Sequence, residues 1–200
     1  ALFRAFSHCL LHYLLRAFVT CRWNRTEKAE FRKNVIEVVM STDMSSHFDI
    51  MGAFSSTVLK VTKGGSEYQQ RLSMVQEAAG GTKTREKFFA LDKTSQILSM
   101  KVAIKIADVG HCMTPFDVHH RWSHHLEEEF FRQGDAEKAL GVPISPLMDR
   151  SKTGVNYPSN QIGFLDVIIV PMLESFFQVF PGAALLLETA QVNREEWQKR

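Results

Sequence analysis

Histidines form the first group of residues whose spacing could do chemistry. Most of the eight histidines lie between positions 111 and 125: His111, His119, His120, His124 and His125. His120 and His124 are four residues apart, so on a helix their imidazoles could bind one metal ion. The zinc-protease pattern, however, needs a glutamate directly after the first histidine, and Arg121 stands there. A solvated, histidine-rich helix face is therefore favoured, and a metal-binding helical protein is the weaker alternative.

Carboxylates form the second group. Glu127, Glu128 and Glu129 are consecutive, so they point in different directions around a helix, and such a run is usually solvated. One of them could still be internal, because the apolar Leu126 and Phe130 flank the run. Asp108 differs, since it ends the apolar segment 102–107. A carboxylate there is costly unless it is paired or bound to metal, so a functional and a structural role both stay open.

An amide and an aromatic ring form the third group. Gln161 and Phe164 are three residues apart and would share one face of a helix. Such a pair can grip a flat heteroaromatic ligand, because the amide bonds its edge and the ring stacks on its plane. A helix start that packs one aromatic residue is the alternative. The chain contains neither a Gly-rich phosphate loop nor a GxSxG nucleophile elbow.

The elements that must position these residues are predicted to be helices. Alternating apolar and polar residues typical of strands are hard to find, so we predict an all-α fold with one compact body. Thr26 can cap a helix whose apolar face is Phe31, Val35, Val38 and Val39. A short surface helix is expected over 68–79, and Thr94 can cap a helix over 95–108.

The C-terminal half is expected to hold two further helices around a long loop. A helix should open near Pro115 with a core-facing stripe of Val118, Trp122, Leu126 and Phe130. Glycines and prolines from Gly134 onward should end it and begin a loop that runs to Pro158. Ser159 can then cap a long apolar helix, and the polar tail 188–200 is compatible with a helix.

Composition excludes several classes of protein. Lys and Arg number 24 against 22 Asp and Glu, a net charge of +2, so no basic field argues for nucleic acid. Cys9, Cys21 and Cys112 are too few and scattered for a disulfide framework, which favours a reducing, cytoplasmic setting. Membrane association through regions outside this chain is the alternative. Charges interrupt both apolar stretches, 1–20 and 162–180. We expect a buried or half-buried helix in the first, with a signal peptide as the alternative, and a kinked core helix at Pro171 in the second. No membrane span is therefore expected within these 200 residues.

Six ordered segments together resemble one enzyme family, the class I 3′,5′-cyclic nucleotide phosphodiesterases. The segments are TDMSSHF (42–48), IADVGH (106–111), RWS (121–123), EEFFRQGD (128–135), PISPLMDR (143–150) and QIGFLD (161–166). The resemblance runs over about 27–181 and covers the C-terminal part of the family's catalytic domain. It implies an all-α domain with two divalent metal ions, one zinc-type and one magnesium- or manganese-type. Metal-bound hydroxide would hydrolyse cyclic AMP, cyclic GMP or both to 5′-monophosphates in signalling.

The resemblance also implies roles for single residues. Asp108 matches a metal ligand, Gln161 the glutamine that hydrogen-bonds the purine, Phe164 the ring that stacks on it, and Leu126 the aliphatic residue on its other face. Further pocket residues are implied at Phe130, Val109 and Leu147, and Asp43 and Met44 match positions near the metal site. His111 stands where many members have Asn, and the calmodulin-stimulated branch, which takes both nucleotides, also carries His.

The chain departs from the family at its catalytic motifs. Neither His-Asn-x-x-His nor His-Asp-x-x-His occurs, and His8 and His12 receive no role. We therefore expect the later part of a larger catalytic domain, inactive or nearly so by itself, and a degenerate non-catalytic protein that binds nucleotide or a partner is the alternative. The predicted division is 1–25 as an uncertain helical segment, 26–182 as catalytic-domain part and 183–200 as polar tail. The predicted partners are the cyclic nucleotide and, as an option, a second copy in a homodimer.

Overall fold

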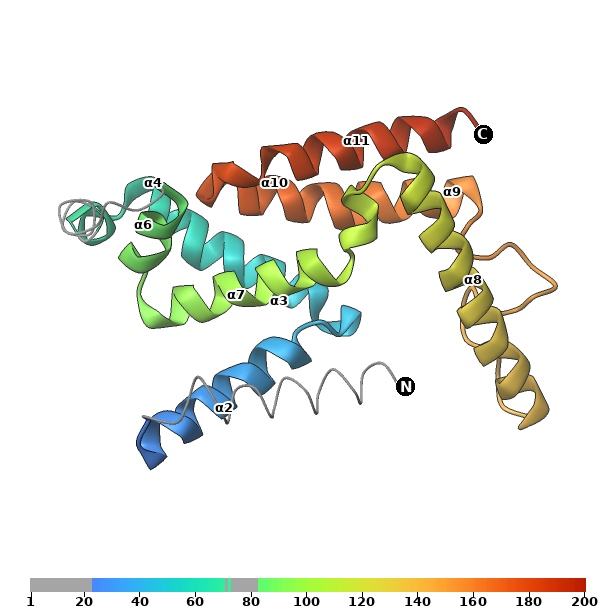
Figure 1. Cartoon of the computed structure of the whole chain (residues 1–200), viewed down its shortest axis with the longest axis horizontal. Helices are drawn as coiled ribbons and strands as arrows, with labels where there is room; N and C mark the ends of the chain where they lie inside the picture. The colour runs from blue at the N-terminus through green and yellow to red at the C-terminus, as the bar shows by residue number, and fades with distance from the viewer. Residues whose placement is uncertain (1–22, 71, 73–82) are drawn as a thin grey trace. The chain divides into compact units, whose positions relative to one another are not determined.

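The structure, a computed structural model, describes residues 23–70, 72 and 83–200, and these ranges contain helices and loops but no strand (Figure 1). The all-α prediction is confirmed, but the prediction of one compact body is wrong. The chain divides into two compact units, Ala1–Met40 and Ser41–Arg200. The helix predicted in 1–20, Cys9, Cys21 and most of the helix predicted over 68–79 lie outside the described residues. The predicted divisions near 25 and 182 stay predictions.

The first unit contributes one described helix, α2 (Arg25–Met40). Its cap is Asn24 and not the predicted Thr26. The Asn24 side-chain oxygen accepts the Glu27 N–H at 2.9 Å, and the Glu27 carboxylate accepts the Asn24 N–H at 2.8 Å. This reciprocal pair is a capping box, which satisfies two N–H groups at once. Val39, predicted on the apolar face, is exposed.

The second unit holds a core where helices from distant parts of the chain meet. In chain order its elements are η2 (Met44–Ser46), α3 (His47–Phe54), η3 (Ser55–Leu59), α4 (Lys60–Gly64), α6 (Lys83–Ala90), α7 (Lys93–Asp108), η4 (Gly110–Met113), α8 (Phe116–Ala139), α9 (Pro158–Phe164), η5 (Leu165–Ile169), α10 (Val170–Val179), η6 (Pro181–Ala183) and α11 (Ala184–Gln198). Helix α3 packs on α7, and α10 and α11 run side by side (Figure 1). Phe54, Val102, Leu165, Met172 and Trp197 are fully buried between them.

The N-terminus of α7 is held by Asp92 and not by the predicted Thr94. The Asp92 carboxylate accepts the Ser95 N–H at 3.0 Å and the Ser95 hydroxyl at 2.7 Å. These bonds lower the pKa of Asp92, because they favour the charged carboxylate. Asp92 therefore fixes where the helix that carries Asp108 begins.

Asp92→Ala is expected to destabilise the second unit by about 1 kcal/mol, because the Ser95 N–H loses its acceptor. Urea denaturation followed by helical circular dichroism measures this loss. Thr94→Ala, the matched control at the exposed predicted cap, is expected to change stability by less than about 0.5 kcal/mol. Equal losses in the two variants would contradict the assignment of the cap.

Helix α8 begins after Pro115 as predicted, but it buries a different face. Trp122 of the predicted stripe is 58% exposed, whereas His119 and Ser123 are completely buried. Successive residues are about 100° apart around a helix, so a shift of one position turns the contact face away from the predicted stripe. The contacts of α8 with η4 and α11 select the face that carries His119.

The loop from 140 to 157 returns along α8 (Figure 1). The helix does not end at Gly134 as expected, but continues to Ala139, and Gly141 follows with a φ of 69° that suits glycine. Gly134 is instead buried where the loop touches the helix. A Cβ atom on Gly134 would lie 1.8 Å from the carbonyl oxygen of Met148, so the loop approaches closer than any side chain allows.

The long apolar helix begins with Pro158 in its first turn, so the predicted cap, Ser159, already lies inside it. Pro158–Val179 is long and apolar enough to cross a membrane, judged by length and composition alone, with 28% of its most apolar window buried. Leu165, Ile169, Met172 and Leu173 belong to the hydrophobic core, as expected of a core helix. Pro171 follows the π-helical turn η5, where a kink was predicted.

Candidate functional site

A buried lysine gathers three of the predicted metal-site residues at one end of α7. Lys105 is 2% exposed, and its Nζ donates to the carbonyl oxygens of Ser41 at 3.0 Å and Asp43 at 3.3 Å and lies 3.9 Å from the sulfur of Met44. Burial lowers the pKa of Lys105, while the nearby Asp108 and Asp43 carboxylates oppose this shift. The lysine thus ties the 41–44 turn to the last turn of α7. Sequence reasoning gave Lys105 no role, although it was the one charge inside the apolar segment.

The two predicted carboxylates at this end differ in their surroundings. Asp43 caps η2 by accepting the Ser45 N–H at 2.9 Å, and this bond lowers the pKa of Asp43. Asp108 is the last residue of α7 and is exposed. Asp108 therefore offers its carboxylate to solvent, where a ligand can reach it.

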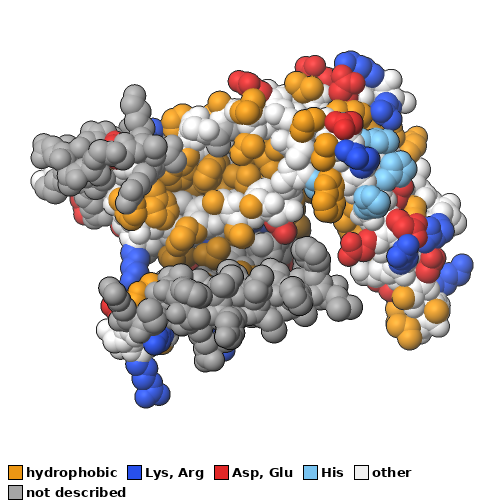
Figure 2. Space-filling view, in the orientation of Figure 1, with side chains coloured by type: hydrophobic (Ala, Val, Ile, Leu, Met, Phe, Trp, Pro, Cys, Tyr) orange, Lys and Arg blue, Asp and Glu red, His pale blue; other side chains and the backbone are white. Residues whose placement is uncertain are grey.

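A chain of three rings joins η4, α8 and α11. The Trp197 indole N–H donates to His119 Nε2 at 2.9 Å, and His119 Nδ1 lies 3.1 Å from His111 Nδ1. An indole N–H can only donate, so His119 Nε2 must accept and the neutral ring carries its proton on Nδ1. That proton is donated to His111 Nδ1, which places the His111 proton on Nε2. Figure 2 shows histidine side chains gathered where α8 begins.

Three of the described side chains could hold a metal ion: His111, Cys112 and His119 place their ligand atoms within 4.8 Å of one another. Trp197 argues against this use, because metal on His119 Nδ1 would put a proton on Nε2, facing the indole N–H. Burial raises the pKa of the Cys112 thiol to about 12, so the thiol stays protonated in this setting. Hydrogen bonds between the rings satisfy these nitrogens instead.

The two metal positions considered from the sequence, Asp108 and the pair His120 and His124, lie outside the group of His111, Cys112 and His119. The His120 and His124 rings pack edge to face with their centroids 5.0 Å apart, and His120 Nε2 lies 3.3 Å from the guanidinium of Arg200. A cation beside His120 disfavours a second cation there. Within the described ranges, then, the residues do not complete the two-metal centre that the resemblance implied.

The buried side-chain amide of Gln161 makes a hydrogen bond through its nitrogen but not through its oxygen within the described residues. Gln161 is 4% exposed on α9, and its Nε2 donates to the Val155 carbonyl at 2.7 Å. Its Oε1 is buried and has no hydrogen-bond partner among the residues that the structure describes. Because a carbonyl only accepts, Nε2 must face Val155, and this contact assigns the orientation of the amide. Gln161 therefore holds a buried acceptor that no described residue bonds.

The other predicted base-contacting residues are only partly enclosed. Phe164 and Val109, which lies on the turn after α7, are half-buried against the core. Leu126 and Phe130 on α8 are half-buried. Met44 and Leu147 are exposed, and Leu147 has a φ of 66°. An apolar groove of ≈ 600 Å³ opens between α7, α10 and α11 (Figure 2), and a cavity of ≈ 330 Å³ lies between α8 and the loop. Neither includes Gln161 or Phe164, so neither is the predicted base pocket.

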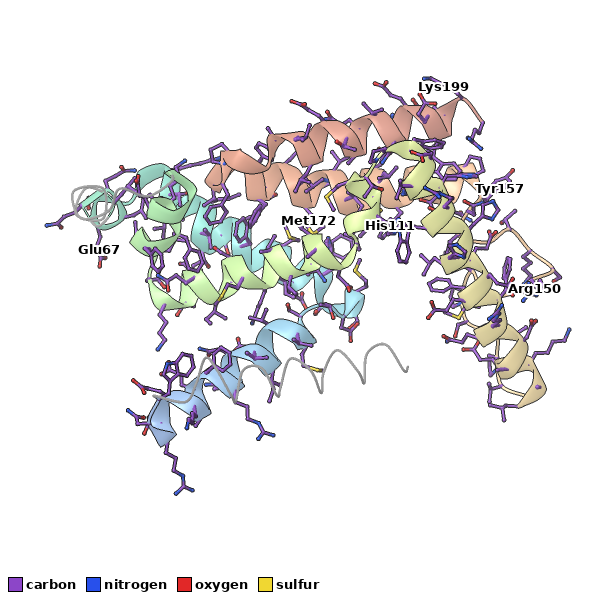
Figure 3. All side chains as sticks on the ribbon, viewed as in Figure 1. Glu67, His111, Arg150, Tyr157, Met172 and Lys199 are labelled. Carbon is purple, nitrogen blue, oxygen red and sulfur yellow. The ribbon has the colours of Figure 1, made fainter. Side chains whose placement is uncertain are left out.

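The consecutive glutamates separate as their helical directions require. Glu128 binds Arg132 at 3.0 Å and Arg150 at 2.8 Å, and Arg150 also reaches Asp135 at 3.0 Å. Arg150 projects from the loop beside α8 (Figure 3). The bonds to Arg150 and then Arg132 lower the pKa of Glu128 to about 2. Glu127 is half-buried and accepts the Asn156 N–H at 3.0 Å, a contact that sequence reasoning could not place.

Comparison with known structures shows which fold the chain has. The phosphodiesterase domain of the rhodopsin–phosphodiesterase fusion protein from the choanoflagellate Salpingoeca rosetta superposes with a TM-score of 0.68 at 22% identity. The match covers 98% of this chain and 55% of that one. At this identity the likeness shows the fold alone, the helical fold of a phosphodiesterase domain.

Sequence comparison then identifies the family. The family model for 3′5′-cyclic nucleotide phosphodiesterase matches residues 9–190, and the chain belongs to this family. A Caenorhabditis elegans protein named as a probable 3′,5′-cyclic-AMP phosphodiesterase is 31% identical over 179 residues. A mouse dual specificity calcium/calmodulin-dependent 3′,5′-cyclic nucleotide phosphodiesterase is 38% identical over 142 residues.

The chain spans only part of these relatives. The nematode match covers 88% of this chain and 23% of the nematode protein, and the mouse match covers 71% of this chain and 16% of the mouse protein. The resemblance to class I phosphodiesterases is confirmed, while the roles predicted for single residues stay predictions.

Proposed function

We propose that this chain is part of an enzyme that hydrolyses 3′,5′-cyclic nucleotides to 5′-monophosphates, and that its described residues recognise the purine. The observation that carries the proposal is the buried Oε1 of Gln161, which has no hydrogen-bond partner within the described ranges. A buried acceptor without a partner is costly, and a ligand that donates a hydrogen bond would remove that cost. The edge of adenine offers its 6-amino group and the edge of guanine its N1–H. Gln161 therefore suits both cyclic AMP and cyclic GMP.

Phe164 supports the same role. It lies three residues after Gln161 on α9 and shares its side of the helix. A half-buried phenyl ring beside an amide can stack on the plane of a purine while the amide bonds the purine's edge. Leu126 of α8 is proposed for the opposite face of the base, and Val109, His111, Met44, Phe130 and Leu147 for the surrounding pocket.

The whole enzyme is proposed to use two divalent metal ions, one zinc-type and one magnesium- or manganese-type. When bound, such ions lower the pKa of a bridging water and neutralise charge on phosphoryl oxygens. Asp108 is the residue proposed as a ligand from this chain. Since no three-ligand group includes Asp108 in the described part of the chain, we assign no catalytic step to these residues. The cytoplasm and a homodimer are the proposed setting and assembly.

Gln161→Ala in the full-length gene product is expected to raise KM for both cyclic nucleotides about tenfold, with a smaller effect on kcat. The reason is that the substitution removes a hydrogen bond to the base, which lies away from the reacting phosphate. Magnesium-dependent hydrolysis of cyclic AMP and cyclic GMP measures both constants. Gln178→Ala, at an exposed glutamine on α10, is the matched control and should leave KM unchanged.

Three outcomes would contradict parts of the proposal. No hydrolysis by the full-length product would overturn the enzymatic activity and favour a non-catalytic protein that binds nucleotide or a partner. An unchanged KM in Gln161→Ala would remove that residue from base recognition. The 200-residue chain assayed alone is expected to show little or no turnover, and robust turnover would show that a complete metal centre forms within it.

A further inference from the structure

Three side chains hold one short piece of backbone next to Gln161. Asn160 Nδ2 donates to the Gly154 carbonyl at 2.8 Å, Gln161 Nε2 donates to the Val155 carbonyl at 2.7 Å, and Glu127 Oε1 accepts the Asn156 N–H at 3.0 Å. We call Glu127, Asn160 and Gln161, together with the backbone 154–156, the clasp. Two of its side chains come from α9, whereas Glu127 comes from α8, 29 residues before Asn156. Glu127 is therefore the anchor that ties this backbone to another helix.

The packing at Gly154 shows how closely the backbone approaches α8. Gly154 is buried, and a Cβ atom there would lie 2.4 Å from Glu127 Oε1 and 2.6 Å from the tip of the Phe131 ring. Any side chain at this position would push the Glu127 carboxylate away from the Asn156 N–H. The close approach and the hydrogen bond of Glu127 therefore depend on each other.

The neighbouring arginines do not compete for the Glu127 carboxylate, which accepts the Asn156 N–H. Arg150 and Arg132 both bond to Glu128 and not to Glu127 in the described contacts. The described contact of the Glu127 carboxylate is to a backbone N–H. A carboxylate on a neutral N–H makes a short-range, directional bond, which fixes position better than a long-range charge attraction does.

The position of the Val155 carbonyl decides how the Gln161 amide is oriented. The terminal torsion of glutamine has broad minima, so its amide can turn over when no partner holds it. With Val155 in place, Nε2 is committed and Oε1 is the atom that a ligand meets. If the 154–156 backbone moved away, either amide atom could face the ligand. Whatever holds this backbone consequently holds the acceptor of Gln161 in place.

We propose that Glu127 is a positioning residue: its bond to the Asn156 N–H holds the Val155 carbonyl, and the carbonyl holds Gln161 Oε1 as the acceptor for a purine N–H donor. The nature of the ligand rests on the proposed function, whereas the orientation of the amide does not. Glu127 touches no substrate and acts only through the backbone 154–156.

The test compares two variants of Glu127 with a matched pair at Glu129, an exposed glutamate on the same helix. Glu127→Met keeps the length of the side chain but removes the acceptor, and Glu127→Gln keeps an acceptor oxygen. In nitrogen-15 spectra of the 200-residue chain, the Gln161 side-chain amide is assigned by its loss in Gln161→Ala. Glu127→Met is expected to speed solvent exchange of this amide about tenfold, since the bond to Val155 opens more often. Glu127→Gln, Glu129→Met and Glu129→Gln should keep the original rate.

Titration of the same samples with cyclic AMP and cyclic GMP measures whether the orientation of Gln161 affects nucleotide binding. Glu127→Met is expected to weaken binding of both nucleotides about threefold, and Glu127→Gln should restore it. Gly154→Ala provides a second approach, because it displaces the Glu127 carboxylate without deleting it. It should speed exchange as Glu127→Met does, and it keeps the proposal testable if Glu127→Met does not fold.

The outcomes separate this proposal from the proposed function. Unchanged amide exchange in Glu127→Met, or equal loosening in Glu127→Gln, would overturn the positioning role of Glu127. If exchange responds as expected but neither nucleotide shifts the Gln161 signals of the original chain, the clasp stands and base recognition by this chain fails. If nucleotide shifts those signals equally in all variants, with equal affinity, the link from Glu127 to the ligand is wrong.

Discussion

Gly134→Ala is expected to destabilise the second unit by about 3 kcal/mol, at the upper end of the cost of overpacking. The added Cβ would lie 1.8 Å from the carbonyl oxygen and 2.7 Å from the carbonyl carbon of Met148. Both atoms belong to the backbone, so no side-chain rotation relieves the clash and the 140–157 loop must move away from α8. Urea denaturation followed by helical circular dichroism measures the loss.

Gly163→Ala is the matched control, because Gly163 also lies inside a helix and has nothing within 4 Å of its added Cβ. It is expected to stabilise the protein by about 0.5–1 kcal/mol, since alanine loses less backbone entropy than glycine in a helix. The two substitutions are chemically identical, so opposite signs report the close approach of Met148. A stabilising effect of Gly134→Ala would show that the loop does not lie against α8.

The positions of the helices followed from local patterns, but their caps did not. Asn24 and Thr26 both carry capping side chains two residues apart, and the same holds for Asp92 and Thr94. Either member of each pair fits the preference for a cap. The choice depends on which oxygen reaches the first free N–H groups, and Asp92 gains a second bond from the Ser95 hydroxyl. A single sequence shows the candidates but not these bonds.

The candidate site shows the same division between local and distant information. The spacing of Gln161 and Phe164 predicted a shared helix face but left their role open, and the family resemblance implied base binding. The structure places both residues on α9. Among the histidines, the i, i+4 spacing drew attention to His120 and His124, whereas the buried ring chain uses His119. Its partner Trp197 is 78 residues away, and no local spacing indicates such a contact. Glu127 likewise bonds to the backbone of the 140–157 loop, and the apolar pattern of α8 does not indicate that contact.

The stability of the protein is expected to fall as the pH drops from about 6.5 to about 4, and His119 is expected to cause up to about 3 kcal/mol of this loss. Burial, and then the neighbouring His111, lower the pKa of His119 from 6.5 to about 4. Between these two values the unfolded chain binds a proton on His119 that the folded chain excludes, so protonation favours unfolding. Above pH 6.5 the ring is neutral in both states and contributes no slope.

His119→Gln separates this contribution from that of other groups. Burial also lowers the pKa values of His47 and His111, so they act in the same direction. Glutamine can accept the Trp197 N–H and donate to His111, but it does not titrate. The loss of stability between about pH 7.5 and about pH 4.5 should therefore be about 2.5 kcal/mol smaller in the variant than in the original chain.

A control substitution outside the ring chain should not change the pH dependence of stability. His124→Gln, at an exposed histidine of the same helix, should keep the pH dependence of the original chain. Urea denaturation at several pH values measures all three proteins. If His119→Gln lost as much stability in acid as the original chain, His119 would be able to take up a proton in the folded chain without loss of stability. The Trp197 N–H could then not be donating to His119 Nε2, and the tautomers derived for His119 and His111 would be wrong.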